Sequence, residues 1–165
     1  MGFWNKLKQG FTQLTGGGGN MQLQVLNPQV KRGENLNVAI TLNCTSQLSG
    51  KSVNLEVAGQ ETIKFQVPVP ATTSPAATAQ GASITPQTQE QTKSSQTYHN
   101  SVVVDAGPVN MQQGETKQYN ASIPIPATVQ PSYAGTDARH EWRVRAYLDI
   151  SLGADIDEDA EITVL

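Results

Sequence analysis

Two histidines and one cysteine are the side chains of this 165-residue chain best suited to catalysis or metal binding. His99 and His140 fall in different predicted strands, and no second ligand stands at the spacing of a zinc site. Cys44 is in phase with the apolar side of its strand, whereas a reactive thiol needs a partly exposed, electropositive setting. There is no glycine-rich phosphate loop or nucleophile elbow. We therefore expect no enzymatic activity, no cofactor and no metal ion, with Cys44 in the core and His99 at the surface or half-buried.

An acidic segment near the C-terminus has the alternating carboxylates with which a calcium loop begins. Its members are Asp155, Asp157, Glu158, Asp159 and Glu161. The EF-hand pattern needs Gly at its sixth position, where this chain has Ala160, and a Glu that would fall beyond Leu165. A solvated hairpin turn is the simpler interpretation, and a calcium site of another kind between sandwich loops is the alternative.

Arg143 and Arg145 alternate along one predicted strand and could form a basic recognition stripe. Glu141 and Asp149 share their side of that strand, so ion pairing across strands is the simpler account. Such exposed pairs contribute only about 0–1 kcal/mol. The chain has 11 Lys and Arg against 14 Asp and Glu, a formal net charge of −3. It therefore lacks the basic surface of a nucleic-acid-binding protein, and we expect no nucleic-acid partner.

The N-terminal segment carries the strongest functional signal. Its apolar residues recur at helical spacing, which predicts an amphipathic helix over 1–15 followed by a glycine-rich tether over 16–20. The residues expected to dock are Phe3, Trp4, Lys6, Leu7, Lys8, Phe11 and Leu14. The apolar side chains would insert or pack, and the lysines would contact lipid headgroups. Three surfaces could receive the helix: its own sandwich, an anionic membrane, and a partner protein or second copy.

After Asn20 the hydrophobic period changes from helical to two. About eight short segments alternate in this way, separated by Gly- and Ser-containing turns, with no helical pattern between them. They include Met21–Val25, Leu36–Leu42, Val53–Val57, Ile63–Val67, Tyr98–Asp105, Tyr119–Ile125 and Trp142–Ile150. This pattern predicts an all-β fold in which residues 21–165 form a single antiparallel β-sandwich.

The stretch 69–95 interrupts the strand pattern. It is rich in Ala, Thr, Gln, Ser and Pro, and besides Val69 it holds one large aliphatic residue, Ile84. Such a segment cannot bury enough apolar surface to offset the entropy of ordering it. We expect a disordered polar insertion between two strands.

The order of several short motifs resembles that of arrestin-like domains, in particular the bacterial sporulation-control protein family. The motifs are GFWNKL at 2–7; Val30, Gly33, Leu36 and Val38; Gly114 and Glu115 before Ile123-Pro124-Ile125-Pro126; and Arg139–Leu152 before Asp155–Glu161. The resemblance implies an arrestin-like, immunoglobulin-like β-sandwich that serves protein–protein scaffolding without catalysis. Relatives often have two such sandwiches, and this chain has the length of one.

These observations predict a non-enzymatic cytoplasmic scaffold or adaptor that binds unidentified protein partners. The chain has no apolar run long enough to span a membrane, and its N-terminus lacks the apolar core of a signal peptide. The N-terminal helix could add peripheral contact with an anionic membrane surface. The alternatives are a self-assembling structural subunit, which would be a homo-oligomer, and a calcium-binding sandwich module.

Overall fold

The computed structural model of the chain describes residues 18–69, 87–151 and 153–165, and within these ranges all regular structure is strand. The all-β class predicted from the alternating segments is therefore confirmed. The described strands are β1 (Gly19–Val25), β2 (Gln29–Val30), β3 (Asn35–Cys44), β4 (Leu48–Gly50), β5 (Ser52–Pro68), β6 (Thr88–Asp105), β7 (Val109–Met111), β8 (Thr116–Pro124), β9 (Tyr133–Ala134), β10 (Ala138–Asp149) and β11 (Ile156–Val164).

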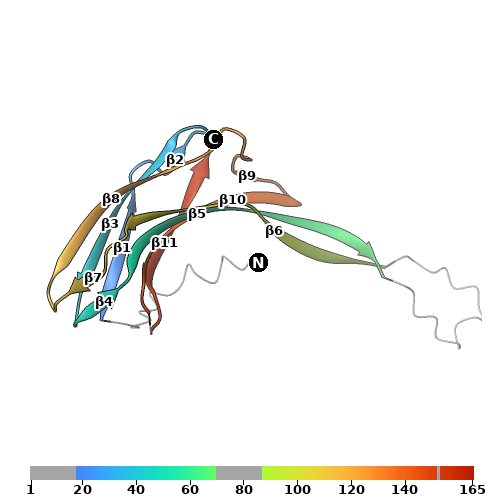
Figure 1. The fold of residues 1–165 in the computed structure, drawn as a ribbon. Coiled ribbons are helices and arrows are strands. Elements are labelled where there is room, and N and C mark those ends of the chain that lie inside the picture. The colour runs from blue at the N-terminus through green and yellow to red at the C-terminus, as the bar shows by residue number, and fades with distance from the viewer. Residues whose placement is uncertain (1–17, 70–86, 152) are drawn as a thin grey trace, which may run out of the picture.

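The strands form two layers and a small accessory sheet (Figure 1). One layer is a six-stranded sheet in the order β2-β11-β10-β5-β6, with β9 beside β10. The other is a three-stranded sheet in the order β1-β3-β8, and β4 pairs with β7. The prediction of an antiparallel sandwich needs one correction, because β2 and β11 are parallel.

The core lies between the layers and is built by the period-two pattern. In β3 the side chains of Leu36, Val38, Ile40 and Leu42 are buried, and Cys44 closes the row with 4% of its surface exposed. The alternate residues of β10, from Trp142 to Leu148, are also buried. Since successive side chains of a strand point to opposite faces, the intervening residues face away from the core. The prediction that Cys44 belongs to the core is confirmed.

Strand β5 is one continuous strand of 17 residues, where two were predicted. Gly59 suggested a break between Val57 and Ile63. It stands instead opposite Trp142 in the pairing of β5 with β10. A Cβ at this position would lie 3.1 Å from the indole ring, so the glycine meets a packing requirement inside a strand.

Strand β6 begins at Thr88, so the predicted disorder is wrong for Thr88–Ser95. These polar residues are ordered by their pairing with β5, from Glu61 to Pro68. Val69 adds one further bond, its N–H to the Gln87 carbonyl at 2.9 Å. The rest of the predicted insertion, 70–86, lies outside the described residues.

The predicted N-terminal helix over 1–15 also lies outside the described residues. The predicted tether over 16–20 is wrong at its end, because Gly19 and Asn20 open β1 and pair with Cys44 and Asn43. Gly18 precedes them at φ 75°, a conformation that glycine adopts without strain.

Candidate functional site: the arm and its open edge

A two-stranded arm extends the six-stranded sheet beyond the sandwich (Figure 1). It consists of Ile63–Pro68 in β5 paired with Thr88–Lys93 in β6. The arm starts where β10 begins, because Ala138 is the first residue of β10 and lies opposite Ile63. One more backbone hydrogen bond, 2.7 Å from the Lys64 N–H to the Asp137 carbonyl, joins β5 to the residue that precedes β10. From there on, both faces of the two strands are without a covering layer among the described residues.

One face of the arm carries an apolar stripe. Ile63, Phe65 and Val67 alternate along β5 and therefore point to the same side. Ile63 and Phe65 are 39% and 41% exposed, and Val69 beyond them is 40% exposed. A two-stranded hairpin is only marginally stable by itself in water. The stripe is thus apolar surface that a binding partner could cover.

The opposite face of the arm is polar. Lys64 and Gln66 alternate with the apolar residues and stand opposite Thr92 and Glu90. The Lys64 Nζ and Glu90 Oε1 atoms are 3.7 Å apart, and both side chains are about half exposed. An exposed pair of this kind contributes about 0–1 kcal/mol. It balances the charges within the arm more than it stabilises the fold.

Strand β6 is the last of the described strands in its sheet, and no other described strand pairs with its outer edge. In an antiparallel pair, every second residue directs its N–H and C=O groups to its neighbour and the others direct them away. The Lys64 N–H faces Asp137, which places the backbone groups of the opposite residue, Thr92, at the free edge. The same alternation assigns the following residues to this edge: Thr88, Glu90, Thr92, Ser94 and Gln96.

Nearer the sandwich the same edge is protected. The pairing of β5 with β6 shifts between Gly59 and Gln60, which leaves Thr97 as the extra residue of a β-bulge. Beyond the bulge, the Ser101 N–H donates to Asn100 Oδ1 at 2.9 Å. Bulges and local caps of this kind hinder strand addition at an edge. The open edge is therefore confined to Thr88–Gln96.

His140 fixes the root of the arm. Its side chain is 1% exposed, with Nδ1 3.0 Å from the Pro131 carbonyl and Nε2 2.6 Å from Thr97 Oγ1. A carbonyl only accepts, so Nδ1 carries the proton and the Thr97 hydroxyl donates to Nε2. The ring also stacks on Tyr133 at 5.9 Å between centroids. His140 therefore joins the bulge to the connection that precedes β9, and this structural role accounts for both its nitrogens.

Tyr133 and Trp142 extend the same attachment. The Tyr133 hydroxyl donates to Glu61, and this hydrogen bond holds the pKa of the tyrosine above its ordinary value. Trp142 Nε1 donates to the Gln130 carbonyl at 3.1 Å. His99, the other histidine, is exposed as predicted, with Nε2 3.8 Å from Glu56 Oε2. The two histidines thus serve different contacts and form no common site.

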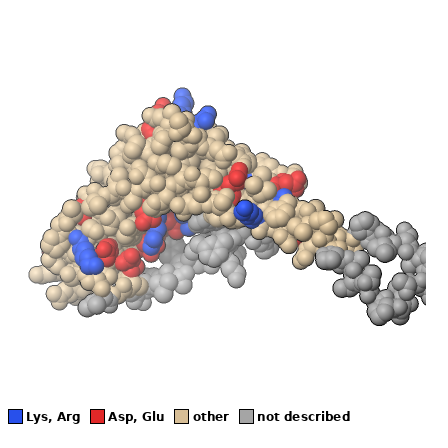
Figure 2. Space-filling view, turned by 45° about the vertical axis from the view of Figure 1, so that its right-hand side comes forward, with Lys and Arg blue, Asp and Glu red and all other residues tan. Residues whose placement is uncertain are grey.

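The arginines of β10 pair with the acidic segment. Arg143 Nε lies 3.2 Å from Asp159 Oδ2, and Arg145 Nε lies 3.0 Å from Asp157 Oδ2. The prediction of cross-strand ion pairing is confirmed, with the partners on β11. The prediction of a hairpin turn for the acidic segment is wrong, because Ile156–Val164 is a strand paired with β10. Figure 2 shows basic and acidic side chains next to one another rather than in a patch of one sign.

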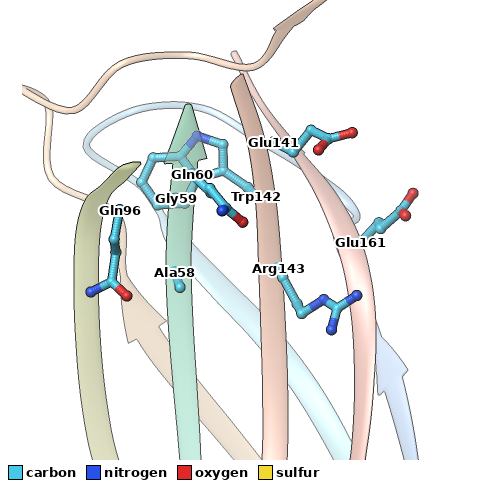
Figure 3. A pocket seen from close by; sticks show the side chains of 8 residues that line it. All are labelled: Ala58, Gly59, Gln60, Gln96, Glu141, Trp142, Arg143 and Glu161. Carbon is cyan, nitrogen blue, oxygen red and sulfur yellow. The ribbon is translucent and has the colours of Figure 1, made fainter. Parts of the chain in front are cut away.

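A shallow depression of about 280 Å³ lies on the face of the six-stranded sheet that points away from the core (Figure 3). Gln60 and Gln96 border it on one side, and Glu141, Arg143 and Glu161 on the other. At its centre stands Ala58, whose side chain is only a methyl group. The hollow holds no pairing of an acid, a base and a nucleophile that would point to a reaction.

Three further site predictions have the following outcomes. Within the described ranges, no three His, Cys, Asp or Glu side chains are grouped so that they could hold a metal ion, so nothing there favours the calcium alternative. Among the same residues, no helix has the length and apolar character needed to cross a bilayer. All seven predicted docking residues, Phe3 to Leu14, lie outside the described part of the chain.

Comparisons with known proteins show the fold and little else. No protein-family model matches the chain, and no curated protein matches its sequence. Among solved structures, the chain is similar to the crystal structure of Spo0M, a sporulation control protein from Bacillus subtilis, with a TM-score of 0.59 and 17% sequence identity. The match covers 90% of this chain and 49% of that one, so the chain spans about half the length of Spo0M. A Spo0M-like, all-β fold is therefore established.

The arm and its open edge were not predicted as a functional feature. One signal was present, because the alternation of Val53–Val57 continues in phase through Gly59 and Glu61 to Ile63, Phe65 and Val67. That phase indicates one long strand. A strand of such length exceeds the usual 3–10 residues and needs a partner of equal length, which only the polar stretch could supply.

Proposed function

We propose that this protein is a non-enzymatic scaffold or adaptor module that binds protein partners by accepting a strand at the open edge Thr88–Gln96. The observation that carries the proposal is the open edge, where five residues of β6 direct backbone groups away from β5 with no hydrogen-bond partner among the described residues, beside the apolar stripe of the arm. In strand addition the main-chain hydrogen bonds provide affinity and the alternate side chains provide specificity. The arm offers both within one short segment.

We further infer that the sandwich is arrestin-like and that the protein works in the cytoplasm. The order of the motifs between Val30 and Glu161 supports the first inference. The likeness to Spo0M, which is a sporulation control protein, agrees with a regulatory scaffold. Spo0M is about twice as long, so a function that needs its second half is not proposed for this chain.

Affinity capture with arm variants tests the proposed function. The full chain serves as bait beside Thr92→Pro, which removes an edge N–H, and Phe65→Ser, which polarises the stripe. Because the Thr92 N–H faces the free edge and Phe65 is 41% exposed, both variants should keep the melting temperature of the unmodified protein. A partner bound through the arm is recovered by the unmodified bait and lost by both variants. Equal recovery by all three baits contradicts the proposal.

The N-terminal segment supplies a second contact in this proposal, with an anionic membrane surface. Its sequence supports this, since residues 1–17 hold two lysines, two Phe and one Trp and no acidic residue. One such helix gives only weak attachment, because each basic residue near an anionic surface contributes about 1 kcal/mol. Flotation with phosphatidylserine vesicles should recover the full chain and lose the Trp4→Glu/Phe11→Glu variant. Equal flotation of the two, or none by either, removes the membrane contact.

A further inference from the structure

We propose that the strand received at the open edge is the open edge of a second copy of this chain, so that two arms join as an antiparallel, two-fold symmetric pair. This inference rests on the proposed function and names its partner.

The backbone directions restrict how two copies can pair. Hydrogen-bonded positions of an antiparallel ladder face one another, so each of the five residues with free groups must face another of the five. All five are used only when Thr92 faces Thr92 of the second copy. Glu90 then faces Ser94, and Thr88 faces Gln96. A shift in either direction leaves at least one of these residues unpaired.

The charges favour the same register. With Thr92 at the centre, Lys93 of each copy faces Gln91 of the other, and no like charges are opposite. A ladder centred on Lys93 would place two lysines opposite each other, and one centred on Glu90 would place two glutamates opposite each other. Like charges in direct opposition destabilise a ladder. The register with the most hydrogen bonds is therefore also free of direct like-charge opposition.

A second copy also supplies what the arm lacks. Two strands with an apolar face are marginal in water, whereas three or more form a stable sheet. Two joined arms make four strands, with Ile63, Phe65 and Val67 of both copies on one face. The bulge at Thr97 and the Asn100 cap protect the rest of β6, which directs association to Thr88–Gln96.

Sedimentation velocity across a concentration series is the first test. The unmodified protein should shift from monomer to dimer as its concentration rises. Thr92→Pro removes the central N–H from both copies, and no hydrogen bond among the described residues uses that group. We expect it to raise the dimer dissociation constant about tenfold or more. The matched control Thr92→Ala keeps the N–H and should stay within about threefold of the unmodified protein.

Cross-linking tests the register. In a hydrogen-bonded antiparallel pair the opposite Cα atoms are about 5.5 Å apart, within the range that a disulfide spans. Thr92→Cys should therefore form a dimer disulfide under mild oxidation, while the native Cys44 is buried. Gln89→Cys is the control, because the two copies of this residue would lie about 20 Å apart. Rapid cross-linking of Thr92→Cys and slow cross-linking of Gln89→Cys support the register.

The outcomes separate this inference from the proposed function. A protein that remains monomeric up to millimolar concentration, and whose Thr92→Cys variant cross-links no faster than Gln89→Cys, overturns the self-pairing. If Thr92→Pro nevertheless loses a captured partner protein, the open edge binds a strand of another protein and the proposed function stands. If neither self-association nor capture depends on Thr92, both are wrong.

Discussion

His140 is enclosed at the root of the arm, and its two nitrogens are bonded to groups from separate parts of the chain. Thr97 Oγ1 is 2.6 Å from Nε2, and the Pro131 carbonyl is 3.0 Å from Nδ1. A buried polar atom that loses its partner costs more than the net value of the bond, because it also loses its solvation by water. The attachment of the arm should therefore be sensitive to the Thr97 hydroxyl.

Thr97→Val tests this attachment while preserving the shape of the side chain. We expect the free energy of unfolding to fall by about 1–3 kcal/mol, since Nε2 of the buried His140 loses its donor. Urea unfolding followed by circular dichroism measures the change. Thr88→Val, in the same strand but remote from His140, should stay within about 0.5 kcal/mol of the unmodified protein. Equal stability of the two variants would show that His140 does not hold the bulge.

Tyr119 makes the fold sensitive to high pH. Burial, and after it the nearby Asp105 carboxylate, raise the pKa of this tyrosine from 10.0 to about 12. Below pH 10 the phenol is protonated in both states and its contribution to stability is complete. Between pH 10 and about 12 the unfolded chain releases the proton first, so the free energy of unfolding decreases as pH rises.

Urea titrations from pH 8 to 12 measure this dependence. The unmodified protein should lose stability above pH 10, and Tyr119→Phe should lose less over the same range. Other groups are common to both proteins and cancel in the comparison. Parallel pH profiles for the two proteins would contradict the assignment to Tyr119.

At the scale of elements, β5 depends on a glycine in the middle of a strand. A Cβ at Gly59 would stand 3.0 Å from Thr97 Oγ1 and 3.1 Å from the Trp142 ring. Both neighbours are held by hydrogen bonds, Thr97 to His140 and Trp142 to the Gln130 carbonyl, so they cannot move aside freely. The position is therefore closed to larger residues.

Gly59→Ala should lower the free energy of unfolding by about 1–3 kcal/mol, the usual cost of overpacking. Thermal unfolding measures the loss. Gly107→Ala is the control, because a Cβ there would meet only Asp105 Oδ1 at 3.5 Å, an ordinary contact. If Gly59→Ala melts at the same temperature as its control, β5 tolerates the added methyl and the packing account is wrong.

The strands that were predictable are those whose own side chains bury one face. β3 and β10 alternate apolar and polar residues between two layers, so their period of two identified them directly. Strand β6 fails that criterion from Thr88 to Gln96, where it has no large apolar residue. Its order comes from hydrogen bonds to β5, a long-range partner that local composition does not reveal. For the same reason the composition of the open edge, which is the candidate site, does not predict it, and only the length of the alternating pattern in β5 points to a partner strand.

The structure of the acidic segment also depends on a partner strand that its own composition does not reveal. Asp157 and Asp159 suggested a solvated turn because their own sequence is polar. They lie in β11, where Arg145 and Arg143 of β10 neutralise them. The resemblance to the sporulation-control family, in contrast, implied an all-β fold, and the similarity to Spo0M shows a fold of that class. Order of motifs was a better guide than the composition of any single segment.

In the whole molecule, the residues that stabilise the fold are different from those proposed to bind a strand. The buried side chains lie between the two layers. The arm projects beyond them (Figure 1), and Ile63 and Phe65 of its apolar stripe are exposed. Substitutions in the arm should therefore change association with little change in melting temperature, whereas substitutions at its root should do the reverse. The central claim is that Thr88–Gln96 receives a strand.

Residue-resolved amide hydrogen exchange tests that claim most directly. In dilute solution the N–H groups of Glu90, Thr92 and Ser94 face solvent and should exchange rapidly, while those of Gln91 and Lys93 bond to β5 and should be protected. At high concentration the first set should become protected at least about tenfold, which restores protection along the whole open edge. If Glu90, Thr92 and Ser94 exchange at the same rates at both concentrations, and also with any captured partner, no strand binds at this edge.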